Sequence, residues 1–170
     1  VEDKVRKRNG VLSGATWTIL PLGQAFNFNG ASAYLEVNNA GTIVFTEETD
    51  MTLEMWFKGT SEGTLFSNGK GDGSDSETSW TIGLDASGKV VVNNNEQAFE
   101  SNTGGYLDND WHHIAIVLQR NSAINMYIDG ALTKTASSND WKGCASAKYW
   151  IGTRGWIAGI TENRDQYFNG

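Results

Sequence analysis

The stretch Asp110 to Gly130, DWHHIAIVLQRNSAINMYIDG, decides the fold of this chain. Residues 111–118 are dense in apolar and β-branched side chains, which predicts a strand covered on both faces. From Ile124 onward apolar side chains alternate with polar ones, which is typical of a strand with one face on the core. The link 119–123 has hairpin length, and Asp129-Gly130 supplies a second turn. We therefore predict a buried β-hairpin at the centre of the fold.

The rest of the composition suits a chain of many short strands. Its 170 residues include 20 glycines, 7 tryptophans and a single proline, which favours tight turns and disfavours long helices. The length is that of one domain. We predict a single all-β domain over 1–170, a two-sheet antiparallel β-sandwich of the jelly-roll, concanavalin A-like type.

Residues 52–58 show the alternation most clearly, with Leu53, Met55 and Phe57 on one face. The other face carries Glu54 beside Trp56, so we expect it to be only partly buried. Further strands are predicted at 10–20, 24–28, 34–37, 64–67, 80–84, 90–92, 131–136 and 148–152. Residues 68–79 are predicted as a long turn, and the tail 153–170 as loop.

Charge and cysteine content exclude several classes of protein. The formal net charge of −7 argues against a nucleic-acid partner, and the four basic residues between positions 4 and 8 are interpreted as a solvated terminus. A single cysteine, Cys144, excludes a disulfide framework and a cysteine-based zinc site. The apolar runs are far too short for a membrane span, and no signal peptide is seen. Because the chain begins with Val1, we expect its natural N-terminus to have been processed or trimmed, or to lie upstream.

His112 and His113 are the residues that most invite a catalytic or zinc interpretation. Neighbouring side chains of a strand point to opposite faces, so this pair cannot hold one ion together. We therefore interpret them as structural. No nucleophile triad or phosphate-binding loop stands out either, because Gly69-Lys70-Gly71 lacks the spacing and the helix of such a loop.

Nine short motifs, in order along nearly the whole chain, resemble laminin-G-like (LamG), concanavalin A-like jelly-roll domains of bacterial and phage surface proteins, a group similar to pentraxin-like lectins. The motifs are SGATW at 13–17, QAFNFNGASAYLEV at 24–37, MTLEMWFKG at 51–59, TLFSNGKGDG at 64–73, SWTIGLDASGKVVV at 79–92, DWHHIAIV at 110–117, INMYIDGAL at 124–132, YWIGTR at 149–154 and YFNG at 167–170. The resemblance implies an extracellular, cell-surface or virion location and a binding or adhesion role toward glycans or a surface partner.

Glycosidases also occur among concanavalin-like folds, and they need two carboxylates across a cleft. Their E-x-D-x-x-E pattern is not present, since the nearest string, TEETD at 46–50, lacks the following glutamate. We therefore predict a protein that is not an enzyme. The alternative to a binding module is a structural subunit of a filament, tail or surface array.

The chain departs from the resembled family at two places. Similar domains carry aspartates after the first Asn-Gly, where this chain has Ala31, Ser32 and Ala33, which weakens a calcium site there. Similar domains also continue past YFNG with an acidic-led strand. The segment Val1 to Arg6 is similar to that strand. We therefore expect residues 1–9, of this chain or of a neighbouring copy, to complete a sheet edge and to support self-association; the alternative is a sequence that ends early.

Ca²⁺ is the one cofactor that the sequence suggests. Asp72, Asp75 and Glu77 supply oxygen donors within one loop, but their spacing does not match an EF-hand. We interpret them as solvated loop residues, with a calcium site as the alternative.

Sugar binding requires exposed aromatic platforms beside polar side chains. Five tryptophans lie in strand patterns and are assigned to the core: Trp17, Trp56, Trp80, Trp111 and Trp150. The predicted ligand-binding residues are aromatic and polar side chains in segments that we predict as loops: Trp156, Trp141, Tyr106, Asn163 and Arg164. Trp156, in TRGWIAG, is the preferred platform.

Overall fold

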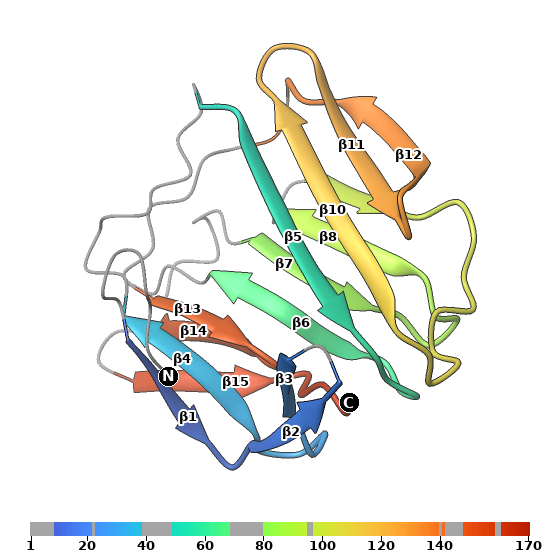
Figure 1. Cartoon of the computed structure of the whole chain (residues 1–170). Helices are drawn as coiled ribbons and strands as arrows, with labels where there is room; N and C mark the ends of the chain where they lie inside the picture. Colours follow the sequence, from blue (N-terminus) through green and yellow to red (C-terminus); the bar gives the residue numbers. More distant parts are fainter. Residues whose placement is uncertain are drawn as a thin grey trace.

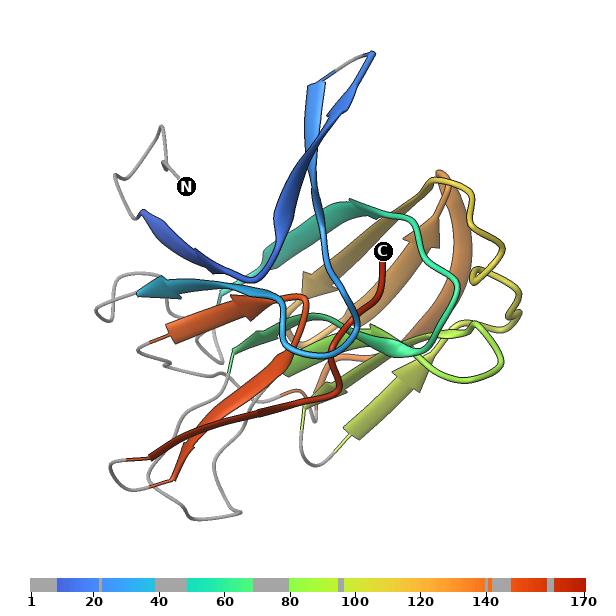
Figure 2. The ribbon, with the colours of Figure 1, turned by 90° about the horizontal axis from the view of Figure 1, so that it is seen from below.

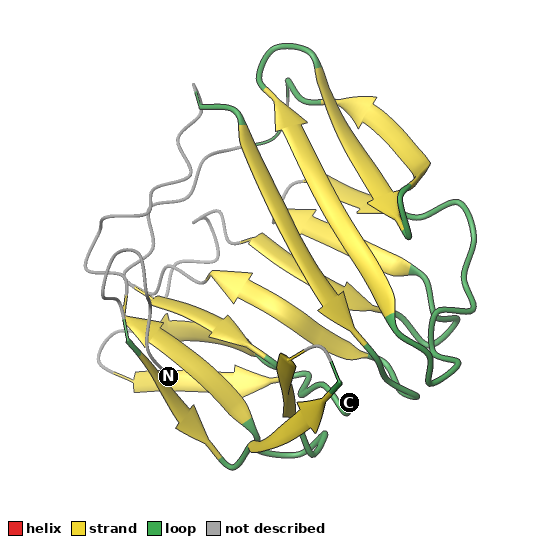
Figure 3. Ribbon diagram, in the orientation of Figure 1, coloured by secondary structure: helices red, strands yellow, loops and turns green. Residues whose placement is uncertain are grey.

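The computed structural model describes residues 9–21, 23–38, 49–68, 80–94, 97–139, 141, 148–158 and 161–170, with the backbone alone at 155–158 and 161–165. Within these ranges the chain forms fifteen β-strands and no helix. No helix long and apolar enough to cross a membrane occurs there. The prediction of an all-β antiparallel sandwich is confirmed, and Figures 1 and 3 show its two large sheets facing one another.

The larger sheet has seven strands in the order β1-β4-β13-β6-β7-β8-β9, each antiparallel to its neighbours. Its strands are β1 (Gly10–Ser13), β4 (Tyr34–Asn38), β6 (Gly63–Asn68), β7 (Trp80–Leu84), β8 (Val90–Asn94), β9 (Gln97–Glu100) and β13 (Lys148–Ile151). Trp80, Ile82 and Val92 are fully buried from this side. The predicted long turn 68–79 lies outside the described residues, except for Asn68 at the end of β6.

The smaller sheet has four strands in the order β12-β11-β10-β5. Its strands are β5 (Met51–Phe57), β10 (His112–Gln119), β11 (Ala123–Ile128) and β12 (Ala131–Ser137). The predicted central hairpin is β10 and β11, which pair from Ile114 opposite Ile128 to Gln119 opposite Ala123. Asn121 occupies a left-handed conformation (φ 56°) in the connecting turn.

The central hairpin is covered on one face, which corrects the prediction for 111–118. Ile114, Ile116 and Leu118 are fully buried between the sheets. Ala115 and Val117 point the other way and are half-buried, since no described element packs over them. The high apolar density of this strand had suggested two covered faces, but its outward members are small. The outer face of the smaller sheet is therefore open.

Two further hairpins complete the described chain. They are β2 (Thr16–Leu20) with β3 (Gly23–Asn27), and β14 (Arg154–Ala158) with β15 (Thr161–Asp165). The β2–β3 hairpin stands away from the sandwich in Figure 2. The hairpin β14–β15 shows that the prediction of a loop for 153–170 was wrong. Its polar and glycine-containing sequence lacks the apolar alternation that identifies a strand.

Residues 166–170 contact strands or strand ends of both large sheets. Backbone hydrogen bonds join the Thr64 N–H to Gln166 (2.9 Å) and the Phe168 N–H to Gly152 (2.9 Å). Gly170 exchanges two such bonds with Phe28, of 2.7 and 3.1 Å. A side chain at Gly170 would collide with the Lys58 carbonyl, so the segment passes closely against the end of β5.

Candidate ligand-binding face

The division of the tryptophans into buried and exposed side chains differs from the prediction. Trp80 and Trp150 are fully buried, as expected. Trp56, Trp17 and Trp111 are 65%, 51% and 40% exposed, which contradicts their assignment to the core. Strand alternation separates the two faces of a strand, but it does not say whether anything covers the second face.

Trp141 shows the opposite error. The sequence places it in a loop, yet it is only 4% exposed and belongs to the core. Its ring lies 4.9 Å from Trp80 and 6.1 Å from Phe99, centroid to centroid, and its carbonyl accepts a hydrogen bond from Arg120. Trp141 is therefore not an exposed platform for a ligand.

The remaining predicted ligand residues lie in two places. Tyr106 is half-buried, with its ring edge-on to His112 at 5.1 Å and its hydroxyl 3.1 Å from Thr103 Oγ1. In the β14–β15 hairpin, Trp156 is opposite Asn163 and Arg164 is opposite Gly155. The hairpin thus brings the backbone positions of Trp156, Asn163 and Arg164 together.

Asp72, Asp75 and Glu77, interpreted as solvated loop residues with a calcium site as the alternative, fall outside the described residues, as do residues 1–8 of the predicted edge strand. Within the part that is described, no three His, Cys, Asp or Glu side chains form a cluster that could hold a metal ion. The turn after Asn29 is organised by hydrogen bonds within the protein. The Asn29 carboxamide oxygen accepts backbone N–H groups from residues 31, 32 and 33 at 2.9–3.0 Å.

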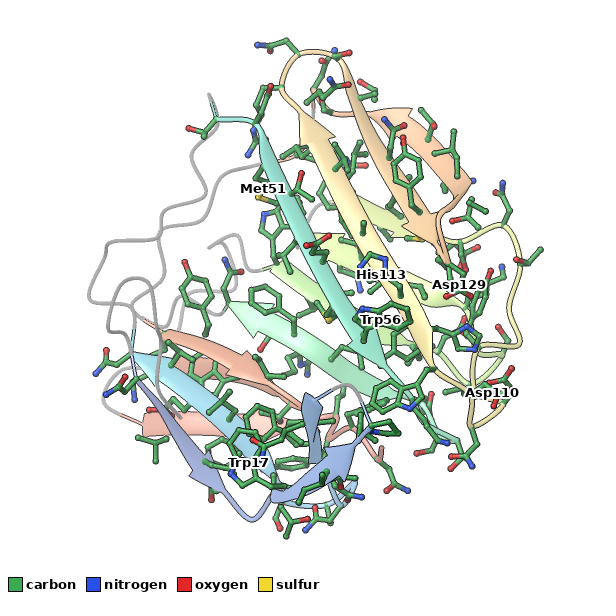
Figure 4. All side chains as sticks on the ribbon, in the orientation of Figure 1. Trp17, Met51, Trp56, Asp110, His113 and Asp129 are labelled. Atoms are coloured by element: carbon green, nitrogen blue, oxygen red, sulfur yellow. The ribbon has the colours of Figure 1, made fainter. Side chains whose placement is uncertain are left out.

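The open face of the smaller sheet carries the most exposed large aromatic ring of the described strands, Trp56 on β5. Trp56 is directly opposite His113 on β10, and their rings lie 5.0 Å apart. Glu54 Oε2 lies 3.7 Å from His113 Nε2. Figure 4 shows Trp56 and His113 side by side on the outer surface of this sheet. The indole is thus supported from one side and open on the other.

Two further rows of side chains continue this face across the sheet. The strand register places Glu54, Ala115, Tyr127 and Leu132 in one row, and Thr52, Val117, Asn125 and Thr135 in the next. Ala115 and Val117 on β10 are the small side chains of these rows, with Tyr127 beside Ala115 on β11 and Trp56 in the neighbouring row on β5. Thr135 Oγ1 donates to Asn125 Oδ1 at 2.7 Å. We call the surface formed by Thr52, Glu54, Trp56, His113, Ala115, Val117, Asn125 and Tyr127 the Trp56 face.

His112 points to the inner side, so the two histidines lie on opposite faces as predicted. Its Nδ1 lies 2.8 Å from Asp129 Oδ2, and its Nε2 lies 3.1 Å from Asp108 Oδ1. Burial disfavours the charged ring, but the hydrogen bonds to Asp129 and then Asp108 outweigh it and raise the pKa of His112. This bridge ties the loop before β10 to the turn after β11, which is a structural role.

The two carboxyl groups of this bridge respond in the opposite direction. Although burial raises it, the pKa of Asp129 is lowered overall by hydrogen bonds from His112 and from the His113 backbone N–H. The Asp110 backbone N–H, and then His112, lower the pKa of Asp108. His112 thus contacts both carboxyl groups, one through each ring nitrogen.

A groove of about 890 Å³ runs along the other edge of β5, between this strand and the β2–β3 hairpin. Its apolar lining includes Phe26, Phe28, Leu53, Met55, Leu65 and Phe66. Gly170 and Lys58 lie at one end. The groove and the Trp56 face are the two open surfaces beside β5.

Solved structures with the same fold include binding domains of toxins. The binding domain of Paraclostridial Mosquitocidal Protein 1 superposes with a TM-score of 0.69 at 18% identity, over 97% of this chain and 44% of that one. The binding domain of botulinum neurotoxin serotype G gives a TM-score of 0.66 at 14% identity, over 98% of this chain and 45% of that one. This chain therefore spans less than half of either toxin domain.

A smaller similar structure is the CBM40 domain of the Ruminococcus gnavus IT-sialidase, solved bound to alpha2,3 sialyllactose. It matches with a TM-score of 0.57 at 16% identity, over 71% of both chains. At these identities the likeness concerns the fold. No curated protein sequence matches the chain. The family model described as the concanavalin A-like lectin/glucanases superfamily, however, matches residues 29–170. This chain belongs to the concanavalin A-like lectin/glucanases superfamily.

Proposed function

We propose that this chain is a non-catalytic extracellular binding module that recognises glycans through the Trp56 face. The single observation that carries the proposal is the position of Trp56, which is 65% exposed in the middle of a regular sheet and supported by His113. A large aromatic side chain held rigidly in water, with no described element covering it, contributes little to the core. It is instead suited to binding.

The chemistry of the Trp56 face fits a pyranose ring. The C–H groups of a sugar face pack on an indole, while its edge hydroxyls require donors and acceptors. Asn125 and Tyr127 provide both kinds of group, and Glu54 provides acceptors. Ala115 and Val117 leave space between the aromatic sides, so that a ring can approach the sheet.

The superfamily and the structural likenesses support this proposal at the level of class. Similar folds act as binding domains in toxins, and one was solved with sialyllactose bound. The strands of the face also lack a pair of catalytic carboxylates. Within 51–57, 112–119 and 123–128, Glu54 is the only Asp or Glu, whereas glycosidases of the usual kind need two.

A glycan array tests the proposal, with wild type, Trp56→Ala, Trp156→Ala and Trp17→Ala compared. We expect wild type to bind a discrete set of glycans and Trp56→Ala to lose at least about tenfold in affinity, as removal of a stacking platform costs about 1–3 kcal/mol. Trp17→Ala is the matched control, because Trp17 is also exposed but packs on Phe26 in the β2–β3 hairpin, with ring centroids 4.3 Å apart.

Each other outcome has a definite meaning. Loss of binding in Trp156→Ala with retention in Trp56→Ala would move the site to the β14–β15 hairpin, where the sequence predicted it. Binding to a cell-surface protein, with no glycan bound, would replace the glycan by a protein ligand. Equal loss in Trp17→Ala and Trp56→Ala would overturn the assignment of the face.

A further inference from the structure

The outer edge of β5 is one of the two edges of the smaller sheet, with the outer edge of β12 at the other side. β5 pairs with β10 over its whole length, from Met51 opposite Leu118 to Phe57 opposite His112. No described strand pairs with its other edge. Figure 1 shows this edge facing the β2–β3 hairpin. An edge of seven residues presents a row of backbone donors and acceptors that another strand can use.

The inward side chains of β5 are also incompletely buried. Leu53 and Met55 point toward the core but remain only partly buried, whereas Ile116 and Ile114, their partners on β10, are fully buried. The apolar groove of about 890 Å³ explains the difference. Its shape, long beside a free strand edge, suits an extended peptide segment that adds a strand and places alternate side chains inward.

We propose that the groove accepts residues Val1 to Arg8 of a second copy of this chain, as an antiparallel strand added to β5. These residues lie outside the described structure, and they read VEDKVRKR. The segment has four basic and two acidic residues in a chain of net charge −7. Charge attraction therefore favours its docking on the remainder of another copy.

One antiparallel register makes three outward pairs complementary. Placing Val5 opposite Met55 puts Arg6 opposite Glu54, Lys4 opposite Trp56 and Glu2 opposite Lys58. Directly opposed residues share a face of the sheet and interact. The register therefore supplies two ion pairs and one cation–π contact, since Glu54 and Trp56 are 68% and 65% exposed and accessible to the incoming side chains.

On the groove side the same register places Val5 against the apolar residues that line the groove. Asp3 and Lys7 flank it toward the two ends of the groove. The stem of Lys7 covers apolar surface next to Leu53 while its charge reaches water. Because donor and acceptor are different surfaces, the contact is heterologous and produces chains or rings of copies. This inference shares Glu54 and Trp56 with the proposed glycan site, but self-association requires residues 1–8, whereas glycan binding does not.

Sedimentation velocity over a concentration series tests the proposal on the full chain. We expect wild type to form species larger than a monomer as concentration rises. Arg6→Glu and Glu54→Arg should each raise the dissociation constant about tenfold or more, and the double variant should recover most of that loss. Glu62→Arg, the same charge change at an exposed residue away from the groove, should behave as wild type. Removal of residues 1–8 should leave only monomers.

Three results would overturn the proposal. Wild type that stays monomeric at all concentrations would show that the segment does not join copies. Assembly that survives removal of residues 1–8 would place the interface elsewhere. Assembly that needs residues 1–8 but is indifferent to Glu54→Arg would exclude the edge of β5. Glycan binding by the chain lacking residues 1–8, measured on the array, reports separately on the Trp56 face, because that variant leaves Glu54 and Trp56 unchanged.

Discussion

β10 and β5 are neighbours in one sheet with the same alternating pattern, yet they differ in burial. The inward residues of β10, Ile114 and Ile116, are fully buried, while Leu53 and Met55 of β5 are only partly buried. β10 has a strand on each side, and β5 has a described strand on one side. Burial in a sheet therefore depends on lateral neighbours as much as on the facing sheet.

The tryptophans show the same dependence across the two sheets. Trp80 lies on β7, near the middle of the seven-stranded sheet, and is fully buried. Trp56 lies on β5, on the face with no described cover, and is 65% exposed. Two tryptophans in similar strand patterns thus serve packing in one place and are available for binding in the other.

The largest expected effect comes from truncating these two tryptophans. We expect Trp80→Ala to lower the free energy of unfolding by about 3–5 kcal/mol, because it leaves a cavity between the sheets. Trp56→Ala should lower it by less than about 1 kcal/mol, since little buried contact is removed. Urea denaturation followed by circular dichroism measures both. A similar loss of unfolding free energy in the two variants would contradict the difference in burial between Trp80 and Trp56.

A smaller pair of variants compares the strands directly. Ile116→Ala on β10 should cost about 3 kcal/mol, within the range for buried aliphatic side chains, and Leu53→Ala on β5 about 1 kcal/mol. The same denaturation measurement applies at a protein concentration that keeps the chain monomeric. If Leu53→Ala costs as much as Ile116→Ala, the groove beside β5 is filled in solution within a single copy.

The smallest effect concerns the bridge of His112 with Asp108 and Asp129 at the end of these strands. The raised pKa of His112 means that the bridge stabilises the fold fully below the unfolded value near 6.5, and that this contribution fades as pH rises through the folded value. The lowered pKa of Asp129 means that its contribution is present above 3.8 and fades as pH falls through the folded value.

Replacement of His112 by Asn should therefore cost the most stability between about pH 4 and 6.5, and less at pH 8. Thermal unfolding of wild type and His112→Asn at pH 5 and pH 8 measures the change. His113→Asn on the opposite face leaves the bridge intact and serves as the control. A cost for His112→Asn that is larger at pH 8 than at pH 5 would contradict the bridge of opposite charges.

Sequence reasoning predicted the local patterns of this fold and missed the features that depend on neighbours. Alternation identified β5 and β11 with their inward faces, because period-2 patterning is a local property. Apolar density identified β10 as a strand but wrongly suggested two covered faces. It could not show that Ala115 and Val117 face outward to an open surface. The burial of Trp141 depends on Trp80, Phe99 and Arg120, which are distant in sequence.

The candidate site was missed for the same reason. One signal was available, since Glu54 beside Trp56 on the second face of β5 indicated incomplete burial. Trp56 was nevertheless assigned to the core, because tryptophan in a strand is usually buried. The role of Trp156, Asn163 and Arg164 in binding stays a prediction.

The most direct test of the central claim is a map of the glycan footprint by nuclear magnetic resonance, using the strongest array ligand and the full chain. The Trp56 face predicts chemical-shift changes at the Trp56 indole N–H and at the backbone amides of His113, Ala115 and Tyr127. Changes confined to the β14–β15 hairpin, or absent from β5 and β10, would contradict it.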